Sequence, residues 1–471
     1  MFEKLTVPIL LLYVFFRDFR PSEPFLTPYL RETKNFTKHE VNNMIYPVWS
    51  YSQLPIFIFV LATTDILRYR PVILLGALGY VATWLILIFG TTVEQMELMQ
   101  VTYAVGTACE VAYKSYVFVA VAKADYSKVS LYLSVSTLLG RATSSFTSQL
   151  LHDLGSVSFL SLTWISLVSV SIATILALAI PAPRYLEIRD AWEPDPLLPN
   201  AEDPSFWDKT RARLRKVRQD VVVSYKSAQT RRWSYWAVVC SLLYFMIGNS
   251  SQSLWKDLET EGEKRYNGYV IGTSGLLSSI TSYVLTRYSR RVEQTRGWVL
   301  VLLTSLMTLT ILLPTILQNL YLAYVCDALF NMIVTSCITI SLFKIAHSMT
   351  TNLYGFVVGV NACVAGTLDL LVTLIVIDER VLGWNPRQQY WVYAGFGLLS
   401  VAGYCGYRVV VGWRRQRDGM RRRRNDVSVL AESLDDAIDP LELPGEEALR
   451  GFVNEGADST DDEMVDTREG Y

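Results

Sequence analysis

The chain has 471 residues and a formal net charge of −1, and 51% of its residues are hydrophobic while only 18% are charged. A charged fraction this small lies below the value of about a quarter that is usual in a soluble domain, and a net charge near zero provides no field that would attract a nucleic acid. All six cysteines lie in apolar stretches and none forms a CxxC pair, so the sequence predicts no disulfide framework, no metal site and no cofactor.

Twelve stretches are long and apolar enough to cross a bilayer as helices, which takes roughly 20 residues each. In chain order they lie near residues 6–30, 42–64, 71–91, 96–122, 127–151 and 157–180, and then near 233–255, 267–287, 297–317, 320–346, 354–377 and 390–412. The pattern predicts an all-α membrane protein with an N-terminal six-helix bundle over residues 1–180 and a C-terminal six-helix bundle over residues 233–412.

Two polar segments complete the predicted organisation. Residues 181–232 contain prolines, acids and a basic run, and are expected to form a cytoplasmic linker loop between the bundles. Residues 413–471 begin rich in arginine, become acidic and lack aromatic clusters, so a disordered cytoplasmic tail is expected.

Lysine and arginine are concentrated in the loops that share one side of the membrane with both termini, including Arg68, Arg70 and the linker. Because cytoplasmic loops carry this excess of positive charge, both termini are expected to be cytoplasmic. Asn35, in the sequence Asn-Phe-Thr, then lies in the first outer loop as a candidate glycan acceptor.

Six spans, a long linker and six more spans are typical of a two-bundle transporter of the major-facilitator type, in which a midplane site faces either side in turn. The stretch from Asp65 to Pro71 resembles a degenerate form of the cytoplasmic signature of those transporters. No phosphate-binding loop, voltage-sensor repeat or filter loop is present. No nucleophile–base pair or ligand set indicates a catalytic residue, so an enzyme is not expected.

Charged residues interrupt the first span, where two prolines flank Glu23. The helix is therefore expected to break there, which is tolerated only against protein or a water-filled cavity. A charge at the bilayer centre costs about 3 kcal/mol. Glu23 is thus expected either to contact a substrate or to pair with Arg20, with Arg17 and Asp18 forming a second local pair.

The fourth span places Glu110, Tyr113 and Lys114 on one helical face, because they are spaced by three and four residues. A carboxylate beside an aromatic ring suits an organic cation. The alternative is an internal ion pair between Glu110 and Lys114, which the same spacing favours.

Four more spans carry single polar, charged or aromatic residues. Trp49 in the second span is expected either to pack against its neighbours or to contact a substrate. Asn249 in the seventh span is expected either to hydrogen-bond a heterocycle or to link two helices. Arg141 in the fifth span and Asp369 in the eleventh are charges with no evident partner in the sequence.

Several motifs resemble the thiamine and reduced-folate carriers, solute carrier family 19, a branch of the major facilitators. The resemblance covers most of residues 7–410 and is carried by Arg20-Pro-Ser-Glu-Pro-Phe-Leu-Thr-Pro-Tyr-Leu30, Pro47-Val-Trp-Ser-Tyr-Ser52, Asp65-Ile-Leu-Arg-Tyr-Arg-Pro-Val72, Glu110-Val-Ala-Tyr-Lys-Ser-Tyr116, Tyr266-Asn-Gly268 and Val358-Gly-Val-Asn361. It implies secondary-active uptake of a vitamin at the plasma membrane, either cationic thiamine or anionic folates.

The resemblance also implies which residues bind the substrate. Glu110 is acidic as in the thiamine carriers, and the implied substrate-binding set is Glu23, Trp49, Glu110, Tyr113 and Asn249. The folate carriers' basic residues in the tenth and eleventh spans align with Asn331 and Asp369. Lys114 and Arg141 depart from the thiamine pattern and, with Asn331 and Asp369, are expected to modify specificity.

These features favour a carrier of thiamine or a similar organic cation. A carrier of reduced folate or another organic anion, using Lys114 and Arg141, is the alternative, and a non-transporting membrane receptor of the same fold is a third reading. The expected partners are a small vitamin substrate and the lipid bilayer, and the coupling ion or counter-substrate is left open.

Overall fold

The computed structural model describes residues 2–67, 69–120, 126–155, 157–181, 215, 219, 221–288, 297–348 and 354–437. All regular structure in these ranges is helical. Most of the expected linker, residues 182–214, and the end of the expected tail, residues 438–471, lie outside the described ranges. The chain divides into Met1–Tyr404 and Cys405–Tyr471, and both helical bundles lie within the first of these units.

The N-terminal bundle consists of six spans, two of them built from more than one helix. Its long helices are α1 (Phe2–Asp18), α3 (Tyr46–Leu67), α4 (Arg70–Phe89), α5 (Val93–Ala108), α6 (Glu110–Ala120), α7 (Tyr126–Asp153) and α8 (Phe159–Ala179). The start of α5 carries a capping box: the Thr92 hydroxyl accepts from the Gln95 backbone N–H, and the Gln95 side-chain oxygen accepts from the Thr92 backbone N–H.

The first span breaks where the two prolines predict it. α1 ends at Asp18, a 3-10 turn covers Glu23–Phe25, and a short helix α2 (Leu26–Pro28) leads into π-helical turns at Tyr29–Thr33. The break leaves Arg20 and Glu23 on irregular backbone inside the bundle. A second interruption, at Cys109 between α5 and α6, was not expected. There α4 approaches so closely that a Cβ added to Gly76 would lie 2.5 Å from the Cys109 Cβ.

The C-terminal bundle contains α11 (Ala228–Leu258), α12 (Asn267–Arg287), α14 (Gly297–Leu317), α15 (Leu320–Ser348), α16 (Tyr354–Val372) and the part of α17 (Pro386–Ala437) up to Tyr404. A π-helical turn at Thr373–Ile377 extends α16, and another at Glu40–Ile45 precedes α3. α17 continues past residue 412, so residues 413–437 are helical and the expectation of disorder was wrong for that stretch. Its many arginines, with leucine and alanine, have high helix propensity.

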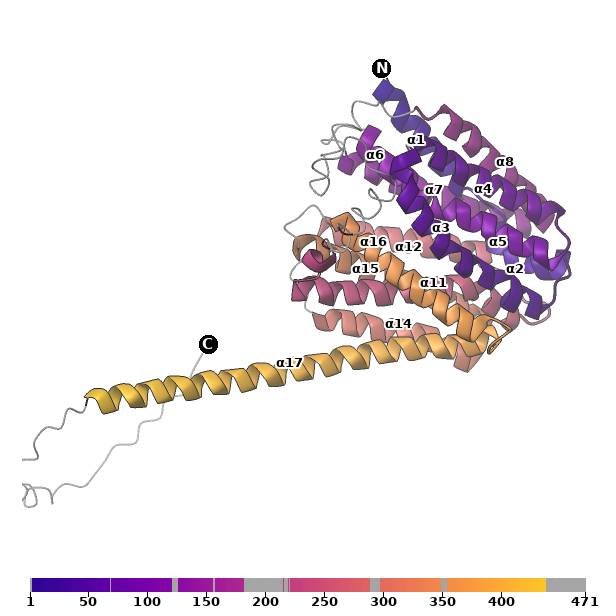
Figure 1. Ribbon diagram of the computed structural model, residues 1–471. Helices are drawn as coiled ribbons and strands as arrows, with labels where there is room; N and C mark the ends of the chain where they lie inside the picture. The colour runs from indigo at the N-terminus through magenta and orange to yellow at the C-terminus, as the bar shows by residue number, and fades with distance from the viewer. Residues whose placement is uncertain are drawn as a thin grey trace, which may run out of the picture. The chain divides into compact units, whose positions relative to one another are not determined.

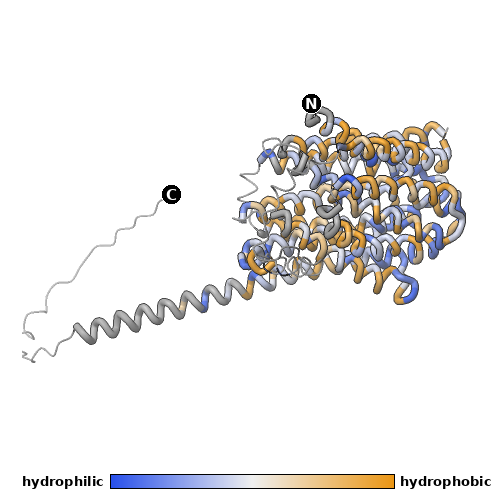
Figure 2. Tube along the Cα trace, turned by 45° about the horizontal axis from the view of Figure 1, so that its top comes forward, coloured by the Kyte–Doolittle hydropathy of each residue, from blue (hydrophilic) through white to orange (hydrophobic). Residues whose placement is uncertain are grey.

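Five described helices are long and apolar enough on their own to cross a membrane: Arg70–Phe89, Phe159–Ala179, Trp298–Leu317, Leu320–Ser348 and Val357–Ile377. Other spans carry polar residues that lower their hydropathy; α7, for example, contains Arg141, Gln149 and many serines and threonines. Figure 2 shows apolar residues along most helices of the first unit, with polar residues interspersed among them.

The two bundles lie side by side, with α1 and α3 to α8 in one and α11, α12 and α14 to α16 in the other (Figure 1). They pack against each other along α7 with α12 and along α3 with α16. Each bundle has its own apolar core, one built around Trp233, Trp236 and Phe330 and the other around Tyr13, Tyr113 and Tyr116.

Candidate substrate-binding site

A cavity of about 590 Å³ lies between the bundles, within the range of about 300–1,000 Å³ found for small-molecule sites. Its wall contains aromatic, amide and charged side chains, together with hydroxyl and apolar ones. The aromatic side chains are Tyr46, Trp49, Trp84, Tyr103 and Tyr244; the amides are Gln100, Asn249, Gln252 and Asn331; and the charged groups are Asp18, Arg20, Glu23, Arg141 and Asp327. Rings and amides together suit a planar heterocycle with hydrogen-bonding edges.

Arg20 and Glu23 form the ion pair expected at the helix break, with Arg20 Nη2 3.2 Å from Glu23 Oε1. The Tyr103 hydroxyl donates to the same carboxylate at 2.8 Å. The Arg20 guanidinium lies 4.7 Å from the Tyr80 ring centroid, and its Nε and Nη1 donate to no described residue. Glu23 keeps a side chain that is 31% exposed, so it faces the cavity while paired.

Arg17 is buried behind the cavity wall and joins three helices. It pairs with Asp18 at 3.3 Å, as expected, and donates to the Tyr80 hydroxyl at 3.1 Å and the Tyr113 hydroxyl at 3.0 Å. Its fourth partner is Glu110, in a close ion pair. The sequence placed Arg17 in a local pair only, because its other partners come from α4 and α6.

Glu110 is engaged by three cations. The expected pair with Lys114 is present at 2.8 Å, Arg17 binds the other carboxylate oxygen, and Arg141 lies 3.7 Å away. Neither Glu110 nor Tyr113 is among the residues that line the cavity. In this conformation both residues hold Arg17 in place.

The two cations that depart from the thiamine pattern differ in position. Arg141 lines the cavity, with a side chain that is 49% exposed and Nε 3.3 Å from Asp18 Oδ1. The Lys114 side chain is 59% exposed but is not part of the cavity lining. It pairs with Glu110, and its Nζ lies 5.9 Å from the centroid of the Tyr113 ring.

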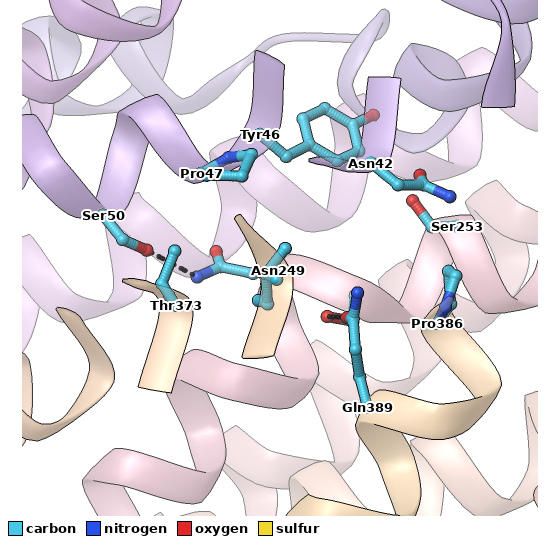
Figure 3. A pocket seen from close by; sticks show the side chains of 11 residues that line it. Asn42, Tyr46, Pro47, Ser50, Asn249, Ser253, Thr373, Pro386 and Gln389 are labelled. Carbon is cyan, nitrogen blue, oxygen red and sulfur yellow. Dashed lines mark hydrogen bonds between the residues drawn. The ribbon is translucent and has the colours of Figure 1, made fainter. Parts of the chain in front are cut away.

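Trp49 and Asn249 both line the cavity. The indole Nε1 of Trp49 has no hydrogen-bond partner among the described residues. Asn249 also borders a small neighbouring pocket, where its Nδ2 donates to the Ser50 hydroxyl at 3.4 Å (Figure 3). Ser50 in turn donates to Asp369 at 3.1 Å, so Asp369 lies beside the site without lining the larger cavity.

Asn331 lines the cavity from α15 and donates to Asp327 Oδ2 at 2.9 Å. Sequence reasoning missed Asp327, although the signal that singled out Asp369, one acid in an apolar span, applies equally to it. The two residues are spaced by four, so they share a helical face.

Ion pairs join the bundles at one end, here called the closed end. Arg31 and Lys38 lie 3.0 and 2.6 Å from Asp257, while Glu32 binds both Lys256 and Arg265. Burial alone would raise the pKa of the Glu32 carboxyl, but hydrogen bonds from Arg265 and Lys256 outweigh it and lower that pKa. The pairs of Glu32 with Arg265 and Lys256 therefore persist to a lower pH than the ordinary pKa of a glutamate would allow.

Several curated proteins and one family model match most of this chain. The reduced folate carrier family model matches residues 1–392. Folate transporter 1 of Caenorhabditis elegans is 31% identical over 410 residues, covering 84% of this chain and 89% of that protein. Thiamine transporter 1 of Homo sapiens is 32% identical over 441 residues, covering 84% and 88%. The human reduced folate transporter is 34% identical over 422 residues, covering 84% and 70%.

Solved structures share the fold at low sequence identity. A POT family transporter solved in meso superposes with a TM-score of 0.61 at 11% identity, covering 86% of this chain and 98% of that one. The nucleoside transporter NupG gives 0.56 at 11% identity, covering 86% and 99%. The predicted two-bundle, major-facilitator architecture is thereby confirmed. The sequence relatives and the matched family model together show that this chain belongs to the reduced folate carrier family.

Proposed function

We propose that this vitamin carrier moves thiamine or a similar organic cation into the cell by secondary-active transport across the plasma membrane, and that it is not an enzyme. The observation that carries the proposal is the composition of the cavity wall. Five aromatic rings and four amides suit a planar heterocycle, and acids outnumber cations among the charged lining residues, which are Asp18, Glu23 and Asp327 against Arg20 and Arg141.

A carrier of folate or another organic anion is the second candidate, and one observation favours it. The charged cluster of the N-terminal bundle contains four cations and three acids: Arg17, Arg20, Lys114 and Arg141 against Asp18, Glu23 and Glu110. The surplus positive charge is exposed at Arg141. An anion would be attracted to that side of the cavity.

Uptake of labelled thiamine and labelled folate, measured side by side in cells expressing the full chain, tests the proposal. Saturable thiamine uptake that unlabelled thiamine suppresses is the expected result. Saturable uptake of folate alone would favour the second candidate. Saturable binding without accumulation of either label inside sealed vesicles would favour a receptor.

The positive charge of the loops supports an orientation with both termini inside and the closed end outside. The bundles would then be sealed on the outer side, in the inward-facing half of an alternating cycle. Epitope tags at residues 1, 210 and 471 should be inaccessible to antibody in intact cells. Surface labelling of the tag at 210 would contradict this orientation.

Asn35 should carry a glycan under the same orientation, because it is exposed close to the closed end. Its backbone is left-handed, with φ of 60°, a conformation that Asp tolerates nearly as well as Asn. Asn35→Asp should therefore remove the glycan without disturbing the loop, and abolish the mobility shift that a glycosidase produces on a gel. A wild-type chain from surface membranes that the glycosidase leaves unchanged would refute glycosylation.

A further inference from the structure

Asp327 is a carboxylate of the cavity wall with no cationic partner among the described residues. It lies on α15, and its Oδ2 accepts from Asn331 Nδ2 at 2.9 Å. Asn331 Nδ2 also lies 2.9 Å from the Asp327 carbonyl oxygen. Among the residues that the structure describes, no Lys, Arg or His side chain lies within ion-pair distance of Asp327, and Oδ1 accepts no hydrogen bond.

The other acids of the wall are already neutralised. Glu23 pairs with Arg20, and Asp18 pairs with three arginines at 3.3 to 3.5 Å. Glu110, the acid that the sequence resemblance implies for a cationic substrate, is engaged by Arg17, Lys114 and Arg141. A cation entering the cavity would have to displace one of these partners to reach them.

An ionised carboxylate that is partly removed from water and left without a counter-charge is costly. A cationic ligand supplies that charge at Asp327, and the Asn331 amide already fixes the carboxylate in place. Arg141, which lines the cavity from the N-terminal bundle, would repel the same ligand. The cavity is thus polarised, with its attraction for a cation on the α15 side.

We infer that Asp327 binds the cationic group of the substrate, a heterocycle with a permanent positive charge, and that Asn331 positions the Asp327 carboxylate. This role rests on the proposed function and refines it. Glu110 then has a different task, which is to hold Arg17 and the charged cluster behind the wall.

Equilibrium binding of thiamine and of folate to the purified full-length carrier tests the role. Asp327→Asn keeps an oxygen that can accept from Asn331 but removes the charge. Loss of a charge-assisted contact is worth about ten- to hundredfold in affinity, so thiamine binding should weaken by that factor. Folate binding should stay equal or strengthen. Asp327→Glu should recover most of the thiamine affinity, and Glu94→Gln, which neutralises an exposed acid at the start of α5, should change neither.

The outcomes separate this role from the proposed function. Unchanged thiamine affinity in a folded Asp327→Asn carrier overturns the role alone. An equal loss of thiamine and folate binding, with a lowered melting temperature, would show a structural role and also overturn it. A wild-type carrier that binds folate but not thiamine overturns the proposed substrate class, and the role of Asp327 with it.

Discussion

Asp18→Asn is expected to remove most of the folded carrier from the cell surface. Asp18 has no exposed side-chain area, and it contacts the guanidinium groups of Arg17, Arg20 and Arg141. The substitution keeps the shape of the side chain but leaves four cations facing two acids. Breaking a buried ion pair by removing one member costs about 3–5 kcal/mol, which is a large part of a typical folding free energy of about 5–15 kcal/mol.

Surface abundance and the melting temperature of the detergent-solubilised carrier measure this effect. The double variant Asp18→Asn with Arg141→Gln has three cations and two acids, which is the same surplus of one cation as in the wild type. It should therefore regain part of the surface abundance and part of the melting temperature. Coupling between the two changes is expected because they share a contact. Glu261→Gln, a loss of the same charge at an exposed loop position, should leave both quantities unchanged. A well-expressed Asp18→Asn carrier with normal melting would contradict the structural role of the cluster.

Gly268→Leu should abolish transport while the protein still folds. Gly268 lies where α12 of one bundle touches α7 of the other, so a larger side chain there affects the contact between the bundles. A Cβ there would lie 2.5 Å from the Ser145 carbonyl oxygen and 2.8 Å from the Gln149 Cβ. The Gly268 amide nitrogen also donates to Gln149 Oε1 at 2.9 Å. Any larger side chain therefore forces the bundles apart near the closed end.

A carrier that cannot close at this end cannot complete an alternating cycle. Uptake should fall to background, and a cysteine introduced at Gln252, in the cavity wall, should react faster with a thiol reagent added from the closed end. Gly359→Ala is the matched control, because an added Cβ meets no atom within 4 Å there. Normal uptake by Gly268→Leu would show that the contact is dispensable.

Much of the fold could be predicted from the sequence because membrane spans are set by local composition. The break near Glu23 followed from two prolines and is confirmed. Helical spacing gave the Glu110–Lys114 ion pair as the alternative to a cation site, and the structure contains that pair. The break at Cys109 could not be predicted, because no helix-breaking residue marks it and it lies where α4 packs closely against the turn. The helical start of the tail was missed because polarity was weighed above helix propensity.

The site was predicted less completely, since its contacts join distant parts of the chain. Trp49, Asn249 and Glu23 line the cavity, and their roles toward a substrate remain proposals. The bond from Arg17 to Tyr113 spans 96 positions, and no local pattern encodes it. That contact decides that Tyr113 faces Arg17 and not the cavity.

The closed end is held by charges that water and ions can reach. Glu32 and Lys38 are 35% and 39% exposed, and their partners Arg265 and Asp257 belong to the other bundle. Exposed charges are screened over about 8–10 Å at physiological ionic strength, whereas the Asp18 cluster is buried and is screened much less. Raising the salt concentration would thus loosen the seal between the bundles and leave the interior of the N-terminal bundle intact. The ionic composition of the solution at the closed end would in this way influence how often the carrier opens there.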